Sequence, residues 1–217
     1  MTRPLIISDC DEVLLHMVVP FRAWLDATHG IHFSFTCGFE EALRQKDSGD
    51  PVERARVWAL LTEFFETRMH LQTPIAGAQA AMTRLATRAD IVIVTNIGAE
   101  LADARAAQLR EHALSWPVIG NRGGKGPVVA ELLAARQAPI AFFIDDLGSN
   151  HASVAKAAPG VWRLQMVGEP ELAPHIAATP QAHARIDRWA TATAWIEARL
   201  DEYEAVVGTG ASGQAPA

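Results

Sequence analysis

Short apolar runs rich in β-branched residues alternate along this chain with stretches of helical composition. The runs lie at residues 5–7, 91–94, 117–119, 140–144 and 161–167, and the stretches of helical character lie at 99–111, 126–136 and 149–157. Strands that alternate with helices predict βαβ units, and therefore a parallel sheet covered by helices on both faces. We expect an α/β fold built on a doubly wound, Rossmann-type parallel sheet.

Residues 17–74 interrupt this alternation, since they contain no convincing buried strand. One helix is expected between Pro20 and Gly30. A second should begin at residues 50–53, where Asp, Pro and Glu occupy the positions of an N-cap, a first-turn proline and a capping-box acid. An apolar stripe at helical spacing follows, made of Val57, Leu60, Leu61, Phe64 and Phe65. The segment therefore predicts a small helical cap inserted after the first strand.

The segments on either side of this insertion are expected to form one core. In this division the core comprises residues 1–16 and 75–205, and the cap comprises residues 17–74. A helix that begins near Trp189 should complete the core. Residues 206–217 are rich in Gly, Ala and Ser, which predicts a disordered tail.

Composition restricts the partners of the chain. Its 217 residues can enclose one sizeable core, and a 49% share of apolar residues is typical of globular proteins. A net charge of −6 provides no electrostatic basis for binding nucleic acid or an anionic membrane.

No apolar stretch is long enough to span a bilayer, and the N-terminus lacks the apolar region of a secretory signal. Since two cysteines, Cys10 and Cys37, are too few for a disulfide framework or a zinc site, we expect a cytoplasmic protein. The oligomeric state is not indicated.

Two aspartates, Asp9 and Asp11, follow the first apolar run. The end of such a strand is where an open parallel sheet places its ligands. Side chains two residues apart in an extended segment point the same way, so both carboxylates can reach one small volume. Unpaired carboxylates are costly at the end of a buried strand, and a metal ion or a reacting group would compensate them.

Three further polar clusters also follow apolar runs. They are Thr95 with Asn96, Lys125 in the glycine-rich stretch 120–126, and Asp145 and Asp146 followed by Asn150. The carboxyl ends of parallel strands share one edge of the sheet, so these clusters can meet the first aspartates in space. Carboxylates suit a hard divalent cation, and lysine, hydroxyl and amide donors suit anionic oxygens. The four clusters together predict a site for a phosphoryl group bridged to Mg²⁺.

In this order, the four clusters resemble the four motifs of the haloacid-dehalogenase-like (HAD) hydrolase superfamily. The resemblance spans the chain from Leu5 to about Asn150, and the insertion stands where that family commonly carries its cap domain. It implies a HAD-like fold. Dehalogenating members need only the first aspartate, whereas phosphoryl-transfer members resemble this chain in having the second, Asp11. The resemblance therefore implies phosphoryl transfer rather than dehalogenation.

By position, the resemblance makes Asp9 the nucleophile that forms an aspartyl-phosphate. Asp11 would protonate the leaving oxygen and then activate the attacking water. The physical chemistry agrees, because a carboxylate attacks a phosphate dianion only where cations cancel the repulsion, so that the metal and Lys125 are required parts. One member of a close carboxylate pair also tends to keep its proton, which suits Asp11 as a general acid.

The other motif positions imply ligands for the metal and the phosphate. The implied Mg²⁺ ligands are Asp9, the backbone carbonyl of Asp11, and an acid from the pair Asp145 and Asp146, with Asp146 favoured. The implied phosphate-binding residues are Thr95, Asn96 and Lys125. Two positions depart from the family pattern. Glu12 replaces the commonest glycine, and Asn150 replaces an acid that supports the metal ligands.

Several functions share these motifs. The leading prediction is a Mg²⁺-dependent phosphatase for a small phosphorylated metabolite, because a cap over the sheet edge excludes water and large partners. A phosphomutase has the same motifs and passes the phosphoryl group to a sugar hydroxyl. A receiver-type signalling domain also uses acids, Thr and Lys, but its phosphorylated Asp follows the third strand. A non-catalytic binding protein would not need the intact acidic, Thr and Lys positions.

The cap should choose the substrate, so the specificity residues are expected within residues 17–74 or at the hinge beside them. The candidates near this hinge are His16, Phe21, Arg22 and Trp24. Nothing in the sequence names the substrate itself.

Overall fold

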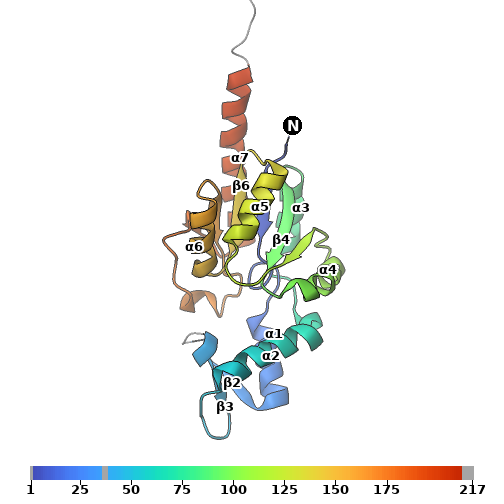
Figure 1. The fold of residues 1–217 in the computed structure, drawn as a ribbon, viewed down its shortest axis with the longest axis vertical. Helices are drawn as coiled ribbons and strands as arrows, with labels where there is room; N and C mark the ends of the chain where they lie inside the picture. Colours follow the sequence, from blue (N-terminus) through green and yellow to red (C-terminus); the bar gives the residue numbers. More distant parts are fainter. Residues whose placement is uncertain (1, 36–38, 212–217) are drawn as a thin grey trace, which may run out of the picture.

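The main sheet is parallel throughout (Figure 1). The computed structural model describes residues 2–35 and 39–211, so Cys37 lies outside the described residues. Within this part of the chain, the sheet has six strands in the order β5-β4-β1-β6-β7-β8. The strands are β1 (Leu5–Ser8), β4 (Asp90–Thr95), β5 (Val118–Gly120), β6 (Ala141–Asp145), β7 (Trp162–Gln165) and β8 (Ala184–Arg185). Every neighbouring pair runs parallel, which confirms the expected sheet.

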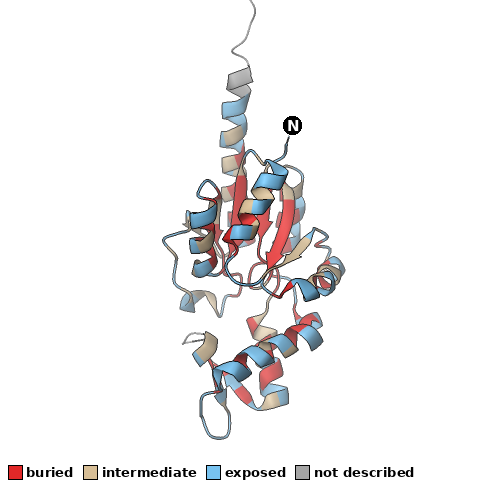
Figure 2. Cartoon of the chain, in the orientation of Figure 1, coloured by how far each residue is buried: buried red, intermediate tan, exposed pale blue. Residues whose placement is uncertain are grey.

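Helices cover both faces of this sheet, as a doubly wound fold requires (Figures 1 and 2). The helices around the sheet are α3 (Ala78–Ala86), α4 (Ala102–Glu111), α5 (Gly126–Arg136), α6 (Gly148–Ala157) and α7 (Trp189–Ala211). Alternate residues of the central strands point to opposite faces. Ile6 and Phe142 therefore join the hydrophobic cluster under α3 and α7, while Ile7 and Phe143 join the cluster under α5 and α6.

The strand order creates a switch point at the carboxyl ends of β1 and β6. From β1 the chain reaches β4 and β5 on one side, and it then returns to β6 on the other side of β1. Open α/β sheets bind ligands at such a point. The strands are in register there, with Ser8 beside Ile144, and the N–H of Asp9 donates to the carbonyl of Ile144 at 2.8 Å. The residues after β1 and β6 are therefore neighbours.

The insertion after β1 lies beyond this carboxyl edge (Figure 1). It contains α1 (Val18–Trp24), a π-helical turn (Leu25–His29), β2 (Ile31–Phe33), β3 (Leu43–Gln45) and α2 (Arg54–Thr67). Short 3₁₀ turns lie at Phe39–Glu41 and Met69–Leu71, and in the core at Ala99–Leu101 and Ala173–His175. The apolar residues of the insertion form a hydrophobic cluster of their own, which includes Phe21, Leu60 and Phe64.

The insertion is not purely helical, which corrects the sequence-based expectation. β2 and β3 form an antiparallel hairpin in which Phe33 pairs with Leu43. Each strand has three residues, and β2 alternates buried, exposed, buried, so the hairpin contains no continuous apolar run. The expected start of the second helix at residues 50–53 was also wrong. Val52 N–H donates to the Leu43 carbonyl at 3.0 Å, which extends the hairpin, and α2 begins at Arg54.

The C-terminal helix is longer than expected. α7 continues to Ala211, so residues 206–211 are helical rather than part of a disordered tail, and residues 212–217 lie outside the described residues. Extending a helix that is already formed costs little, which lets it run past its packed portion. Arg88 anchors the later turns through Asp201 and Glu204, at 2.7 and 2.9 Å. Among the described residues, no helix is both long and apolar enough to cross a bilayer.

Candidate active site

Lys125 connects two of the acidic clusters. It stands at the N-terminal end of α5, and its fully buried Nζ lies 2.7 Å from Asp9 Oδ1 and 2.8 Å from Asp145 Oδ2. Burial alone would lower the pKa of Lys125, but the carboxylates of Asp145 and Asp9 outweigh it and raise that pKa. The lysine therefore stays charged. Oδ1 of Asp9 also accepts from the Cys10 N–H at 2.7 Å, so the orientation of this carboxylate is fixed.

The two acids after β6 have different surroundings. Asp145 is fully buried and accepts hydrogen bonds from Lys125, from the Leu147 N–H at 2.9 Å, and from Asn150 Nδ2 at 3.0 and 3.1 Å. The carboxylate of Asp146 has no hydrogen-bond partner among the described residues, and it lines the adjacent cavity. Asn150, which departs from the family pattern, thus holds Asp145 rather than Asp146.

A divalent cation fits the acids of this edge. Asp9, Asp145 and Asp146 each offer a carboxylate oxygen, and the three oxygens lie within 4.8 Å of one another. Burial, opposed by Lys125 and reinforced by Asp145, raises the pKa of Asp9 to about 7. Burial, Asp145 and Asp9 raise the pKa of Asp146 well above its usual range. Three buried carboxylates with one ammonium are under-compensated, and their hard oxygen donors suit Mg²⁺.

Asp11 is held by side chains that the sequence did not single out. Arg105 Nη2 lies 3.0 Å from Oδ1 and 3.1 Å from Oδ2 of Asp11, and Gln72 Nε2 donates to Oδ1 at 2.6 Å. The Thr95 hydroxyl approaches Oδ2 at 3.4 Å. Arg105 Nη1 in turn donates to Gln72 Oε1 at 2.8 Å and to Gln108 Oε1 at 3.0 Å. The second aspartate therefore sits in a buried network that joins the core to the end of the insertion.

No local signal marks Arg105 as a site residue. It is one of several charged residues in α4, and charged residues on a helix are usually exposed. Its side chain is instead fully buried, with the guanidinium 5.4 Å from the centre of the Phe65 ring. Only the tertiary contact with Asp11 reveals it.

Glu12 accounts for the unusual loop after Asp11. Its φ of +58° is left-handed, a conformation that glycine adopts without the steric cost that other residues pay. Its Oε1 accepts from the N–H groups of Met17 and Val18, at 2.8 and 2.6 Å, and so caps the start of α1. Burial, against these hydrogen bonds, raises the pKa of Glu12 to about 7. The acid at this position thus ties the loop to the insertion.

The predicted phosphate-binding residues reach the same edge in different ways. Thr95 ends β4 and is fully buried beside Asp11. Asn96 lines the cavity, but its Nδ2 donates to the Gly123 carbonyl at 3.0 Å and its Oδ1 accepts from Asn121 at 2.8 Å. The structure therefore brings all four clusters to one edge, with Asn96 joining two loops there.

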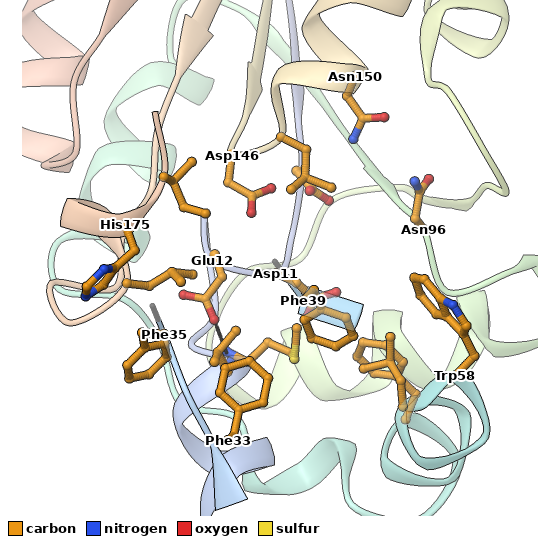
Figure 3. A pocket seen from close by; sticks show the side chains of 18 of the residues that line it. Asp11, Glu12, Phe33, Phe35, Phe39, Trp58, Asn96, Asp146, Asn150 and His175 are labelled. Atoms are coloured by element: carbon orange, nitrogen blue, oxygen red, sulfur yellow. Dashed lines mark hydrogen bonds between the residues drawn. The ribbon is translucent and has the colours of Figure 1, made fainter. Parts of the chain in front are cut away.

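A cavity of about 560 Å³ opens between this edge and the insertion. Figure 3 shows Asp11, Glu12 and Asp146 on one side of it and aromatic rings on the other. The lining side chains from the insertion include Phe33, Phe35, Phe39, Trp58, Leu61 and Phe65. Leu172, His175 and Ile176 close a further side.

The four hinge candidates do not line this cavity. Phe21 and Trp24 are buried in the hydrophobic cluster of the insertion, because α1 turns its apolar side toward α2. His16 Nδ1 lies 2.8 Å from Glu169, and Arg22 pairs with Glu171 at 2.9 Å. The rings that do line the cavity come instead from the hairpin region and from α2.

Comparison with known proteins identifies the fold. No model of a known protein family matches the sequence, and neither does any curated protein. Among solved structures, a haloacid dehalogenase-like hydrolase from Streptococcus pneumoniae is 14% identical with a TM-score of 0.63, over 90% of this chain and 98% of its own. A protein described as a haloacid dehalogenase-like hydrolase from Burkholderia xenovorans is 15% identical with a TM-score of 0.61, over 89% and 96%. The magnesium-bound HAD-type protein YfnB from Bacillus subtilis is 15% identical with a TM-score of 0.56, over 88% and 97%. The chain therefore has the HAD-like fold, as the order of its motifs implied.

Proposed function

We propose that this chain is a Mg²⁺-dependent phosphatase that hydrolyses a small phosphate ester through an aspartyl-phosphate on Asp9. One observation carries the proposal. Asp9, oriented by Lys125, stands at the switch point of the sheet and lines, together with Asp11 and Asp146, the cavity that the insertion covers. The HAD-like fold, which it shares with proteins described as hydrolases, supports the same chemistry.

The proposed first step transfers the phosphoryl group to the protein. A carboxylate oxygen of Asp9 forms a bond to phosphorus while the ester P–O bond breaks. Asp11 gives its proton to the departing alkoxide, which leaves as the alcohol. Lys125, whose ammonium lies 2.7 Å from Asp9, offsets negative charge at this point.

The second step returns the protein to its starting state. Asp11, now ionised, takes a proton from water as the water oxygen attacks the phosphorus of the aspartyl-phosphate. The Asp9 carboxylate is released together with inorganic phosphate. Arg105 and Gln72 orient the ionised carboxylate of Asp11 in this step, because both donate to it.

The proposed metal ligands lie at the carboxyl edge of the sheet. They are the carboxylates of Asp9 and Asp146 and the backbone carbonyl of Asp11. Asp145 serves instead to position Lys125, since its own carboxylate is occupied by that lysine, Leu147 and Asn150. Bound Mg²⁺ would neutralise the phosphate oxygens and so allow the carboxylate to approach. The magnesium bound by YfnB, which has the same fold, supports this choice of ion.

The test is hydrolysis of acetyl phosphate and p-nitrophenyl phosphate by the purified chain with Mg²⁺. Asp9→Asn should abolish turnover and leave the fold unchanged, because it removes the nucleophile at constant shape. The matched control is Asp103→Asn, which alters an exposed aspartate of α4. Mass spectrometry of acid-quenched wild-type protein should find the phosphoryl group on the peptide that contains Asp9. Substantial turnover by Asp9→Asn would refute the proposal.

A further inference from the structure

We infer that the alcohol portion of the substrate is apolar, has one or two rings and carries no second anionic group, so that it is not a sugar, a nucleotide or a bisphosphate. The inference rests on the proposed phosphatase function and adds to it the class of substrate. It follows from the aromatic wall, by which we mean the side chains of Phe33, Phe35, Phe39 and Trp58 that line the cavity opposite the acids (Figure 3).

This wall is a continuous aromatic surface. The Phe33 ring centre lies 5.6 Å from that of Phe35 and 5.8 Å from that of Phe39. The Phe39 ring centre lies in turn 5.8 Å from that of Trp58. Rings in such contact form a broad apolar face against which a planar group can stack or pack edge-on. Because the wall lies across the cavity from Asp146 (Figure 3), a phosphate bound at the acids would direct its ester group onto these rings.

The wall offers few partners for hydroxyl groups. Ser34 is the only residue with a side-chain hydroxyl that the insertion contributes to the described lining. Across from it, His175 stacks on Phe35, with ring centres 6.3 Å apart and planes 14° from parallel. A sugar bound here would exchange hydrogen bonds to water for apolar contacts at most of its hydroxyls, and each unpaired hydroxyl weakens binding. The wall therefore selects against polyols, including the sugar acceptor that a phosphomutase requires.

The charges of the cavity exclude a second phosphate. No lysine or arginine is among the described lining residues, whereas Asp9, Asp11, Glu12 and Asp146 all are. The nearby cations are already engaged: Lys125 by Asp9 and Asp145, and Arg105 by Asp11. Arg22 lies 4.6 Å from the centre of the Phe35 ring, but it pairs with Glu171 and does not line the cavity. A bisphosphate or nucleotide would carry charge that nothing in this space compensates.

The size of the cavity limits the ester group. Its volume of about 560 Å³ is in the range of pockets that enclose a small organic ligand. A two-ring alcohol with its phosphate fits within such a space.

The experiment compares phosphate esters whose leaving alcohols are all primary, so that the chemistry of departure is similar. With Mg²⁺ present, kcat/KM is measured for 2-naphthylmethyl phosphate, benzyl phosphate, glycerol 3-phosphate, glucose 6-phosphate and phosphocholine. We expect 2-naphthylmethyl phosphate to exceed glycerol 3-phosphate and glucose 6-phosphate on the order of 100-fold, as burial of a ring system implies. Acetyl phosphate, which is too small to reach the wall, serves as the reference for basal turnover.

Two single substitutions separate the wall from the rest of the insertion. Trp58 lines the cavity and is 46% exposed, so Trp58→Ala should be tolerated by the fold. It should lower kcat/KM for 2-naphthylmethyl phosphate about tenfold relative to kcat/KM for acetyl phosphate. Leu71→Ala is the matched control, because Leu71 is a 42% exposed apolar residue that does not line the cavity. Calorimetric binding of 2-naphthylmethylphosphonate, which cannot be hydrolysed, provides a readout that does not need turnover.

The outcomes distinguish this inference from the proposed function. If acetyl phosphate is hydrolysed but glucose 6-phosphate or phosphocholine is preferred to the naphthyl ester, the phosphatase stands and the substrate class is overturned. If no ester is hydrolysed but the naphthylmethylphosphonate binds more tightly than glycerol 3-phosphate, and Trp58→Ala weakens it, the cavity assignment stands and catalysis does not. Equal binding of both ligands by the wild type would overturn the inference in either case.

Discussion

Arg105 donates to both carboxylate oxygens of Asp11, at 3.0 and 3.1 Å, from a side chain with no exposure to solvent. The pair joins α4 to the loop after β1, and Gln72 at the end of the insertion bonds to both partners. Taking charges out of water is costly, so such a pair is stable only while its members satisfy one another. The proposed general acid is thus also a structural junction between three segments.

We predict that Arg105→Met destabilises the protein by about 3 kcal/mol, because it leaves the partly buried carboxylate of Asp11 without its cation. Urea unfolding followed by circular dichroism measures the change. Asp11→Asn and the double variant complete a mutant cycle, and a coupling energy near zero would mean that the two residues do not stabilise one another.

Asp11→Asn should slow hydrolysis of alkyl phosphates by roughly 10²- to 10⁴-fold, since the alkoxide then leaves without a proton. For p-nitrophenyl phosphate the loss should be much smaller, because nitrophenolate is stable without one. The check is the ratio of kcat for the two esters in wild type and variant. Equal losses on both would show that Asp11 acts in some way other than by protonating the leaving group.

Asp145→Asn and Asp146→Asn should have different effects although the residues are adjacent. The carboxylate of Asp146 has no hydrogen-bond partner among the described residues, so its substitution should weaken Mg²⁺ binding at least tenfold with little loss of stability. Asp145 accepts from Lys125, so its substitution should lower the free energy of unfolding by about 3 kcal/mol. Calorimetric titration with Mg²⁺ and urea unfolding of each variant separate the two effects. The reverse pattern would exchange the two assignments.

His183, which does not line the cavity, should have a pKa below 6.5. Burial, Arg163 and Arg199 lower its pKa, and its Nδ1 accepts the Arg163 N–H at 2.9 Å, which protonation of that nitrogen would prevent. The unfolded chain binds the proton more readily, so acidification through pH 6.5 removes the contribution of His183 to stability. Its ring proton shifts in a nuclear magnetic resonance titration give the midpoint, with His183→Asn identifying the signals. A midpoint above 6.5 would contradict this prediction.

The buried strands and several helices could be predicted because their signals are local. The apolar run at 91–94 lies within β4, and the stretch at 126–136 corresponds to α5. A strand buried on both faces needs uninterrupted apolar residues, and such a run can be recognised in the sequence without knowing which strands lie beside it. The hairpin of β2 and β3 was missed because each strand has only three residues, which is too short for an apolar run that the sequence would reveal.

The sequence by itself determined that the acids, Thr95 and Lys125 would meet at one edge, because every strand of a parallel sheet ends its run on the same side. Only the tertiary structure decided how the charges are paired. Asp145 rather than Asp146 receives Lys125, and Asp11 receives an arginine 94 residues away. Backbone conformation depends mainly on nearby residues, whereas the partner of a buried charge depends on every group that folding brings within a few ångströms of it.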